Sequence, residues 1–140
     1  MAGYAVVAAR FNDHVVKRLV DGAEACFAKA EVDCRVEWVP GAFELPLAAK
    51  ALAESGRFRA VVCLGAVIRG ETSHFDFVAS EAARGVMHVG LQTGVPVIFG
   101  VLTTDTLEQA LDRAGGEHGN KGWDAAEAAM EMADAMERVR

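Results

Sequence analysis

The stretch that decides the fold is AVVCLGAVIRGETSHF, residues 60–75. Its first nine residues, 60–68, are apolar and rich in valine, which is typical of a strand buried on both faces of a parallel sheet. A polar turn follows, and it leads directly into an amphipathic segment. Ser73 and Asp76 have the spacing of a capping box, so we expect a helix to begin there. The stretch therefore predicts a buried strand, a polar turn and a helix in immediate succession.

The same order of strand and helix recurs along the whole chain. The other expected strands cover residues 5–9, 33–39 and 96–102. The expected helices are one capped by Asp13, one from Pro46 to Ser55, one from Ser73 to Thr93, a short one from Thr106 to Gly115, and one from Trp123 to Arg138. Right-handed crossovers between such strands give a parallel sheet with helices on both faces. We therefore predict one α/β domain over residues 1–140, a three-layer α/β/α sandwich with a four-stranded, parallel, flavodoxin-like sheet.

Composition excludes several classes of protein. Apolar residues make up 52% of the 140 residues, which excludes a disordered chain, and the net charge of −6 with no basic cluster argues against a nucleic-acid partner. No apolar run approaches the ~18 residues that a membrane span needs. Met1 to Ala9 lacks the basic start of a signal peptide. Cys26, Cys34 and Cys63 form no Cys-x-x-Cys pair, so we expect free buried thiols and a cytoplasmic protein.

Four polar turns follow the four expected strands. In a parallel sheet these turns all lie at the carboxyl edge, where open α/β folds bind their ligands. The turns are residues 10–12, 40–44, 68–74 and 103–105. Four remote pieces of sequence are therefore predicted to form one ligand-binding crevice.

Several residues of these turns suit an anionic substrate. Gly70 to Ser73 precede a helix, whose free N–H groups and dipole attract phosphate, although an ordinary capped helix has the same pattern. Arg113 offers a bidentate fork and Lys121 a point charge, and both lie in or beside the glycine-rich loop 115–122. His74 stands where it can transfer protons, or it is a surface residue of the helix start.

Aromatic and polar residues of the first two turns suit a flat heterocycle. Phe11 and Phe43 lie in polar turns, where they could stack on such a ring. Glu44 could accept hydrogen bonds from hydroxyls or only favour the helix start, and Asn12 could orient the ring or end the strand. No two histidines have helical metal-ligand spacing and no cysteine pair accompanies them, so no metal site is expected.

Two helices carry more apolar surface than one sheet face would cover. The helix that ends at Thr93 has additional apolar residues at Val86, Val89 and Leu91. The last helix has two apolar stripes, Trp123, Ala126, Met130 and Ala133 on one side and Ala125, Ala129, Met132 and Met136 beside it. This breadth predicts contact with another subunit.

Taken together, these motifs resemble the lumazine synthase family. The resemblance rests on residues 10–12, 40–46, 65–76, 100–104 and 119–122, in this order, and extends from about Gly3 over nearly the whole chain. It implies the penultimate step of riboflavin biosynthesis, the condensation of 5-amino-6-(D-ribitylamino)uracil with 3,4-dihydroxy-2-butanone 4-phosphate. The products are 6,7-dimethyl-8-ribityllumazine, phosphate and water, and no metal or organic cofactor takes part.

The resemblance also implies roles for individual residues. His74 would shuttle protons, while Arg113 and Lys121 would hold the phosphate that leaves. Phe11 would stack on the pyrimidine, and Phe99 would close the pocket from a neighbouring subunit. Asp124 stands where the family usually has glutamate. The full set of implied substrate-binding residues is Phe11, Asn12, Ala42, Phe43, Glu44, Ala66, Val67, Ile68, Glu71, Thr72, Phe99, Arg113 and Asp124.

The family resemblance further implies self-association. Members that build large shells carry a longer leading segment, whereas only Met1 and Ala2 precede the first expected strand here, which favours a homopentamer over a shell. Riboflavin synthase is an implied protein partner. Two alternatives stay open: a flavodoxin-like nucleotide-binding module, and a non-catalytic flavin-binding or shell-forming paralogue. The turn at residues 10–13 lacks the phosphate loop of the first, and the presence of His74, Arg113 and Lys121 argues against the second.

Overall fold

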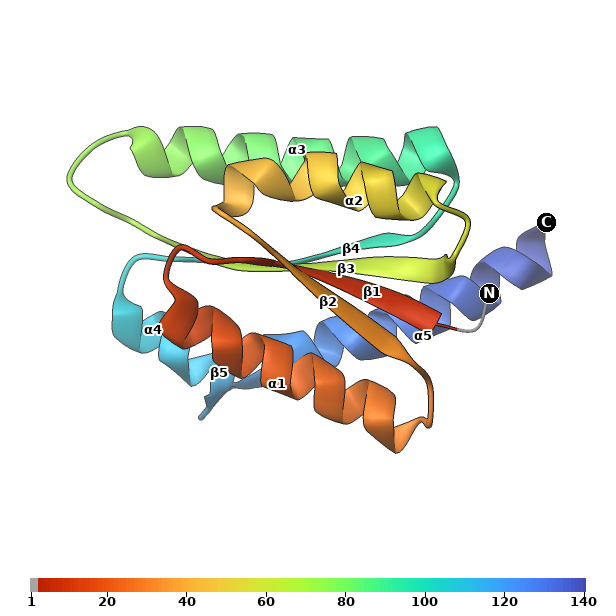
Figure 1. Ribbon diagram of the computed structural model, residues 1–140. Coiled ribbons are helices and arrows are strands. Elements are labelled where there is room, and N and C mark those ends of the chain that lie inside the picture. Colours follow the sequence, from red (N-terminus) through yellow and green to blue (C-terminus); the bar gives the residue numbers. More distant parts are fainter. Residues whose placement is uncertain (1–2) are drawn as a thin grey trace.

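Four parallel strands form the central sheet of the protein (Figure 1). The structure is a computed structural model, and it describes residues 3–140. The strands are β1 (Gly3–Ala9), β2 (Cys34–Val39), β3 (Phe58–Ile68) and β4 (Val97–Thr104), in the order β2-β1-β3-β4. β3 lies inside the sheet, and residues 60–64 are completely buried. The predicted parallel sheet is therefore confirmed, with β4 two residues longer at its end than expected. Two predictions used Met1 and Ala2: that the chain has no signal peptide, and that it forms a pentamer. Both residues lie outside the described residues.

Helices cover both faces of the sheet, which confirms the predicted three-layer sandwich (Figure 1). One face carries α1 (Asp13–Lys29), α4 (Leu107–Asp112) and α5 (Lys121–Val139). The other carries η1 (Ala42–Glu44), α2 (Leu45–Glu54) and α3 (His74–Thr93). The glycine-rich segment expected as a loop instead forms an antiparallel hairpin of β5 (Ala114–Gly116) and β6 (Gly119–Asn120).

Two predicted helix caps are wrong. Asn12, not Asp13, is the residue before α1, and its left-handed φ of 63° is one that asparagine tolerates. The Asn12 side chain does not cap the helix, because its Nδ2 donates to the carbonyl oxygen of Ala66 at 2.8 Å. Ser73 precedes α3 without a capping side-chain bond. Instead, Thr72 Oγ1 accepts a hydrogen bond from the His74 backbone N–H at 3.3 Å.

The hydrophobic core lies on both sides of the sheet. On the α1 and α5 side, the rings of Tyr4 and Phe27 stack with centroids 5.0 Å apart. On the α2 and α3 side, Val86 and Val89 are buried in the chain's own core, so they are not the additional exposed surface that was expected. The alanines of the last helix that were expected at a subunit contact, Ala125, Ala126, Ala129 and Ala133, are likewise buried. What remains exposed on these helices includes Leu91 and Met132.

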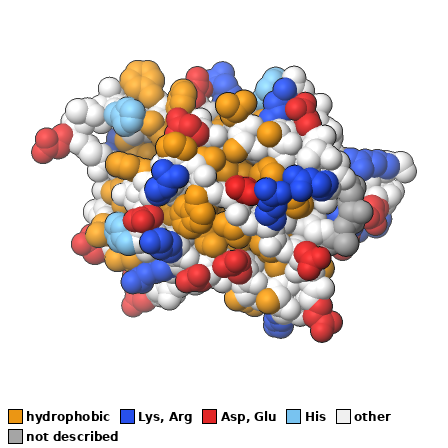
Figure 2. Space-filling view, in the orientation of Figure 1, with side chains coloured by type: hydrophobic (Ala, Val, Ile, Leu, Met, Phe, Trp, Pro, Cys, Tyr) orange, Lys and Arg blue, Asp and Glu red, His pale blue; other side chains and the backbone are white. Residues whose placement is uncertain are grey.

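The face seen in Figure 2 carries hydrophobic side chains over its middle, with charged side chains mostly around them. The strand that crosses the front of this view is β2, as Figure 1 shows. Val36 and Trp38 of β2 are half-buried and pack against the main core. The edge strand thus extends the core to the surface. Within residues 3–140, no helix combines the length and the apolar character needed to cross a membrane.

Burial controls the chemistry of the cysteines. Cys26 and Cys63 are buried, as expected, whereas Cys34 on β2 is only half-buried, and no two of the three form a disulfide. Burial raises the pKa of the Cys63 thiol to about 12. Burial also raises the pKa of Cys34 to about 11, and the nearby Glu24 carboxylate adds to this effect. Thiolates are the reactive form of cysteine, so these two thiols are protected at neutral pH.

We expect the native thiols of Cys34 and Cys63 to resist alkylation at pH 8. Unfolding in urea should raise the rate to that of an ordinary thiol, measured by mass spectrometry. Because the two pKa values are raised on folding, the thiols stabilise the fold fully below about pH 9, the unfolded value, and this contribution is lost as the pH rises toward 11 and 12. A Cys34→Ala variant should lose less stability between pH 8 and 10.5 than the wild type. Equal alkylation of native and unfolded protein at pH 8 would contradict this prediction.

Candidate active site

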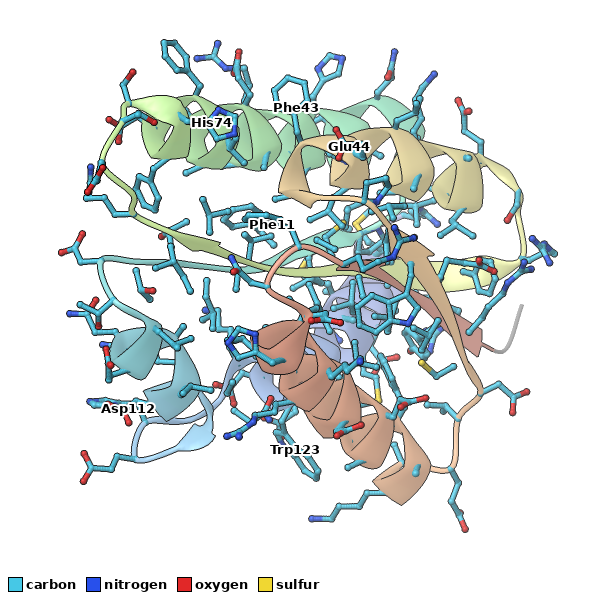
Figure 3. All side chains as sticks on the ribbon, turned by 60° about the vertical axis from the view of Figure 1, so that its left-hand side comes forward. Phe11, Phe43, Glu44, His74, Asp112 and Trp123 are labelled. Carbon is cyan, nitrogen blue, oxygen red and sulfur yellow. The ribbon has the colours of Figure 1, made fainter. Side chains whose placement is uncertain are left out.

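A cavity of about 680 Å³ opens on the α2 and α3 side of the sheet, beyond the carboxyl ends of β1 and β3. The two aromatic side chains predicted to stack on a heterocycle both line it, and so does His74. Figure 3 shows Phe11, Phe43, Glu44 and His74 on this side. The predicted site residues that line this cavity are Phe11, Ala42, Phe43, Glu44, Ala66, Val67, Ile68, Thr72 and His74.

The two phenylalanines of this first cavity have unusual exposure. Phe11 is 73% exposed and Phe43 is 59% exposed, although both are large apolar side chains in an otherwise well-packed chain. Neither ring is needed to fill the core, and both border the same cavity. Aromatic rings bind flat heterocycles by stacking, with an additional gain from the apolar area that leaves water. The first cavity therefore suits a planar ring, with Glu44 and His74 as its polar groups.

A second cavity, of about 890 Å³, holds the other predicted groups. It borders the edge strand β4, and its lining includes Phe99, Arg113, Lys121 and Asp124. Figure 3 places Asp112, the residue before Arg113, on the opposite side of the sheet from His74. Within one chain, the structure therefore brings the predicted site residues together in two separate groups rather than one.

Arg113 and Lys121 of this second cavity are free to bind an anion. Among residues 3–140, no carboxylate oxygen lies within 4.0 Å of the Arg113 guanidinium or the Lys121 ammonium group. Arg113 Nη1 donates to the Gln109 carbonyl oxygen at 3.0 Å, which orients the guanidinium and leaves its other donors available. A half-buried arginine with free donors is well suited to bidentate phosphate binding.

Two predicted site residues line neither cavity. The Asn12 side chain is committed to the carbonyl oxygen of Ala66, so it ties the turn after β1 to the end of β3. The Glu71 side chain is exposed in the turn before α3. Residues of the second cavity that the sequence interpretation missed are Arg69, Gln109 and His118. His118 is exposed, and the hairpin β5–β6, which was not foreseen, brings it to this cavity.

A group of potential metal ligands lies next to the second cavity. One ligand atom each from Asp112, Glu117 and His118 lies within 4.8 Å of the others. The sequence interpretation considered only spacings of histidine and cysteine and therefore did not find this group. Glu117 and His118 are exposed, and exposed acidic groups often lie together without a metal ion. We therefore do not assign a metal site to these three residues.

The family model that describes 6,7-dimethyl-8-ribityllumazine synthase matches residues 2–137 of the chain. The chain belongs to this family. A relative from Syntrophus aciditrophicus (strain SB), named 6,7-dimethyl-8-ribityllumazine synthase, is 53% identical over 139 residues. The alignment covers 97% of this chain and 90% of the relative. The family predicted from the motifs is therefore confirmed, together with its fold, and the two cavities can be considered as parts of a lumazine synthase site.

Proposed function

We propose that the two cavities described above together carry out the reaction of the lumazine synthase family. The chain is a transferase of riboflavin biosynthesis, which condenses 5-amino-6-(D-ribitylamino)uracil with 3,4-dihydroxy-2-butanone 4-phosphate. The products are 6,7-dimethyl-8-ribityllumazine, phosphate and water. The observation that carries the assignment of the site is the first cavity, where two exposed phenylalanines border the same space as Glu44 and His74.

The pyrimidine binds in the first cavity. Phe11 stacks on the ring, and Phe43 covers it from the turn after β2. Ala66, Val67 and Ile68 form the wall at the end of β3. On the β1 side they lie beyond the last paired residues, Ala8 and Leu64, so backbone groups there can pair with the heterocycle. The Glu44 carboxylate accepts hydrogen bonds from the ribityl hydroxyls, which are neutral donors.

The butanone phosphate binds between the first cavity and a cationic group. Thr72 lines the first cavity two residues before α3 begins, so its hydroxyl and the free N–H groups of the helix start receive the phosphate. Arg113 and Lys121 neutralise the charge of this phosphate. These two cations lie on the other side of the sheet within one chain, so we infer that they come from a second copy.

An apolar groove supports the second copy. The groove has a volume of about 620 Å³ and runs between α3 and α5 along β4, with Met87, Leu91 and Met132 exposed on it. Ala83 and Phe99 line both this groove and the second cavity, so the two are continuous. A neighbour seated in the groove would bring its first cavity to Phe99 and Arg113. Because the two faces differ, the contact is head-to-tail and repeats until a ring closes, as in the predicted homopentamer.

The chemistry follows from these positions. The amine of the pyrimidine attacks the ketone carbon, and the carbinolamine loses water to give an imine. His74 moves the protons of these steps. Elimination then breaks the bond between carbon and the phosphate oxygen, while Arg113 and Lys121 stabilise the developing charge on the leaving group. The second amine closes the ring with loss of another water. Holding both substrates in one orientation supplies much of the rate.

The first experiment is an absorbance assay of lumazine formation above the uncatalysed reaction. Wild-type protein should give a saturable rate, and His74→Ala should lower kcat at least about tenfold because a proton-transfer group is lost. His88→Ala is the matched control, since His88 is exposed on the same helix and lines neither cavity. Unchanged turnover in His74→Ala would contradict its role. No wild-type rate, with riboflavin still bound, would favour a non-catalytic paralogue.

Mixing two inactive variants tests whether the site is shared between copies. We expect His74→Ala and Arg113→Met to be weak alone. When the two are unfolded together and refolded as mixed oligomers, activity should return to about one quarter of wild type, because random neighbours join two intact halves in about one site of four. No recovery would place the whole site within a single chain.

Two further features concern the compartment and a protein partner. The cytoplasm is the proposed compartment, because the three cysteines among residues 3–140 are free thiols, which persist where the medium is reducing. Association with riboflavin synthase, which consumes the product, stays a prediction from the family.

A further inference from the structure

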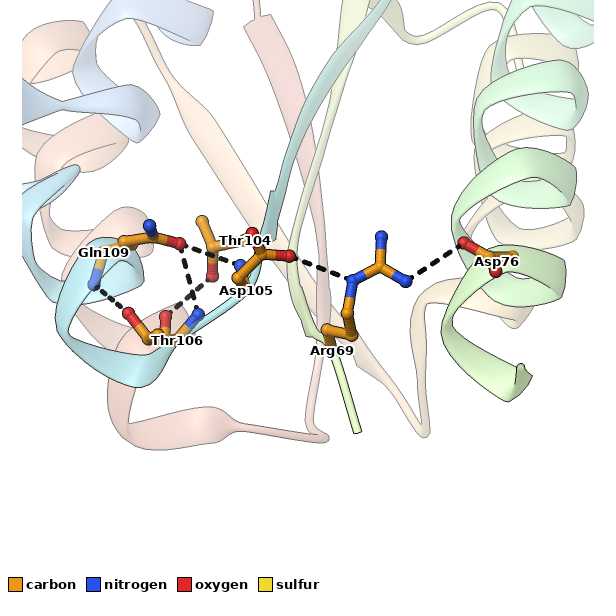
Figure 4. Close-up of polar contacts among 6 residues, drawn as sticks. All are labelled: Arg69, Asp76, Thr104, Asp105, Thr106 and Gln109. Carbon is orange, nitrogen blue, oxygen red and sulfur yellow. Dashed lines mark hydrogen bonds and ion pairs between the residues drawn. The ribbon is translucent and has the colours of Figure 1, made fainter. Parts of the chain in front are cut away.

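Arg69 is the first residue after β3, and its side chain contacts two other segments (Figure 4). Its backbone N–H donates to the Thr104 carbonyl oxygen at 2.9 Å, which continues the pairing of β3 with β4. Its Nε donates to Asp105 Oδ1 at 2.9 Å, in the turn that follows β4. The guanidinium also reaches the first turn of α3. Arg69 therefore joins the start of α3 to the turn between β4 and α4.

The turn at the β4 end of this contact is firmly held. The Asp105 backbone N–H donates to Gln109 Oε1 at 2.8 Å. The Thr106 N–H also donates to Gln109 Oε1, at 3.2 Å, and the Gln109 N–H donates to Thr106 Oγ1 at 3.1 Å. This is a capping box, in which side chain and backbone satisfy each other at the start of α4. Thr104 Oγ1 adds a bond to the Thr106 carbonyl oxygen at 2.9 Å. Asp105 is thus a fixed anchor for Arg69.

The α3 end of the contact combines charge and stacking. Arg69 Nη1 lies 3.6 Å from Asp76 Oδ1, and its guanidinium carbon lies 4.4 Å from the centroid of the Phe75 ring. Both partners belong to the first turn of α3. One guanidinium thus faces two carboxylates, which neutralise its charge. Arg69 is therefore paired with carboxylates, whereas within residues 3–140 Arg113 is not.

The segment between these two ends is the turn 70–73, which is exposed throughout. Outside the regular pairing of β3 and α3, its hydrogen bonds within residues 3–140 reach no further than α3. Thr72 Oγ1 accepts from His74 and the Ser73 carbonyl oxygen from Asp76. No atom lies within 4 Å of the place where a Cβ on Gly70 would stand. The position of this turn therefore depends on how its two ends are held.

We propose that Arg69 is a positioning residue, which fixes the phosphate-binding turn 70–73 by tying the start of α3 to the turn after β4. The inference rests on the proposed function, which places the phosphate of the butanone substrate at this turn. Arg69 acts through the turn and does not touch the substrate. Its loss should therefore weaken phosphate binding and leave the pyrimidine site, built by Phe11 and Phe43, intact.

The test compares Arg69→Met with Arg35→Met. Arg35 pairs with Glu37 at 2.6 Å on β2, and both arginine side chains are 48% exposed, so the control removes an equally exposed ion pair away from the turn. We expect Arg69→Met to raise the KM for the butanone phosphate about tenfold, since small displacements of a binding group are costly. The Ki of inorganic phosphate should rise in parallel, and the KM for the pyrimidine should change less than about twofold. Arg35→Met should match wild type.

Asp105→Asn distinguishes positioning from direct binding of phosphate. This variant frees the Arg69 guanidinium from its anchor. If Arg69 positions the turn, the KM for butanone phosphate rises here too, and the double variant with Arg69→Met is no worse than the worse single variant. A lower KM in Asp105→Asn, or equal rises for both substrates in Arg69→Met, would overturn the proposal. Absence of lumazine formation by the wild type would instead overturn the proposed function.

Discussion

Replacement of Arg113 by methionine is expected to lower kcat/KM for the butanone phosphate by about 10²- to 10³-fold, the effect of removing one donor that stabilises a developing charge. Methionine keeps an unbranched stem of similar reach, so the loss reports the guanidinium. The Nη1 of Arg113 donates to the Gln109 carbonyl oxygen. No carboxylate of residues 3–140 forms an ion pair with the guanidinium, so its other donors can bind phosphate. Because phosphate leaves in the reaction, kcat should fall together with affinity.

Initial rates with one substrate varied at a time check this prediction. The KM for the pyrimidine should stay within about twofold, because its site lies in the first cavity with Phe11 and Phe43. Arg138→Met is a suitable control, since Arg138 is exposed near the end of α5 and lines neither cavity. Arg113→Lys should recover part of the rate, because lysine keeps the charge and loses the bidentate fork. Equal losses for both substrates would contradict the assigned role.

The core strand and the layer order could be predicted from sequence alone. The valine-rich run 60–68 is typical of a strand buried on both faces, and the structure has it as β3. The helix starts were less predictable, because several polar residues compete at each one. At α1 the Asn12 side chain bonds to Ala66, 54 residues away. At α3 the hydroxyl that accepts a backbone N–H is that of Thr72, from His74, and not that of Ser73. Spacing along the chain contains no information on such long-range partners.

The residues of the site could be predicted from the sequence, but their distribution over two separate cavities could not. Each of the four predicted turns follows a strand, and this alone places it near the carboxyl edge of the sheet. Which side of the sheet a cluster occupies depends on the hairpin β5–β6, which carries the segment after Arg113 along the α4 and α5 side. Arg69 was missed for a similar reason: its role arises from Asp105, 36 residues away, and no local motif marks that pair.

Gly122→Ala should be the most destabilising single substitution proposed here. Gly122 is buried at the second residue of α5, where it packs against the backbone of α1. A Cβ at this position would overlap the Leu19 carbonyl oxygen and would stand 2.6 Å from the Leu19 carbonyl carbon. Backbone cannot rotate away as a side chain can, so α5 must move as a whole. Alanine favours a helix over glycine by about 1 kcal/mol, which offsets only part of this cost.

We therefore expect Gly122→Ala to lower the free energy of unfolding by about 3 kcal/mol or more, since overpacking of a core contact has costs of this order. Urea denaturation at fixed protein concentration measures the change, because association would shift the midpoint. Gly22→Ala is the matched comparison on the other helix of the same contact. The three atoms nearest to its Cβ would all belong to the Asn120 side chain, which caps α5 and can rotate away, so the cost should be about 1 kcal/mol.

The same displacement should reach the active site. Lys121 begins α5, immediately before Gly122, and it faces the second cavity with Arg113. The Lys121 N–H donates to the Arg113 carbonyl oxygen at 2.8 Å, so a shift of α5 moves both phosphate-binding cations. Folded Gly122→Ala protein at low temperature should have a raised KM for the butanone phosphate and a nearly unchanged KM for the pyrimidine. A variant as stable as Gly22→Ala, with both KM values of the wild type, would show that the contact between α1 and α5 tolerates a side chain here.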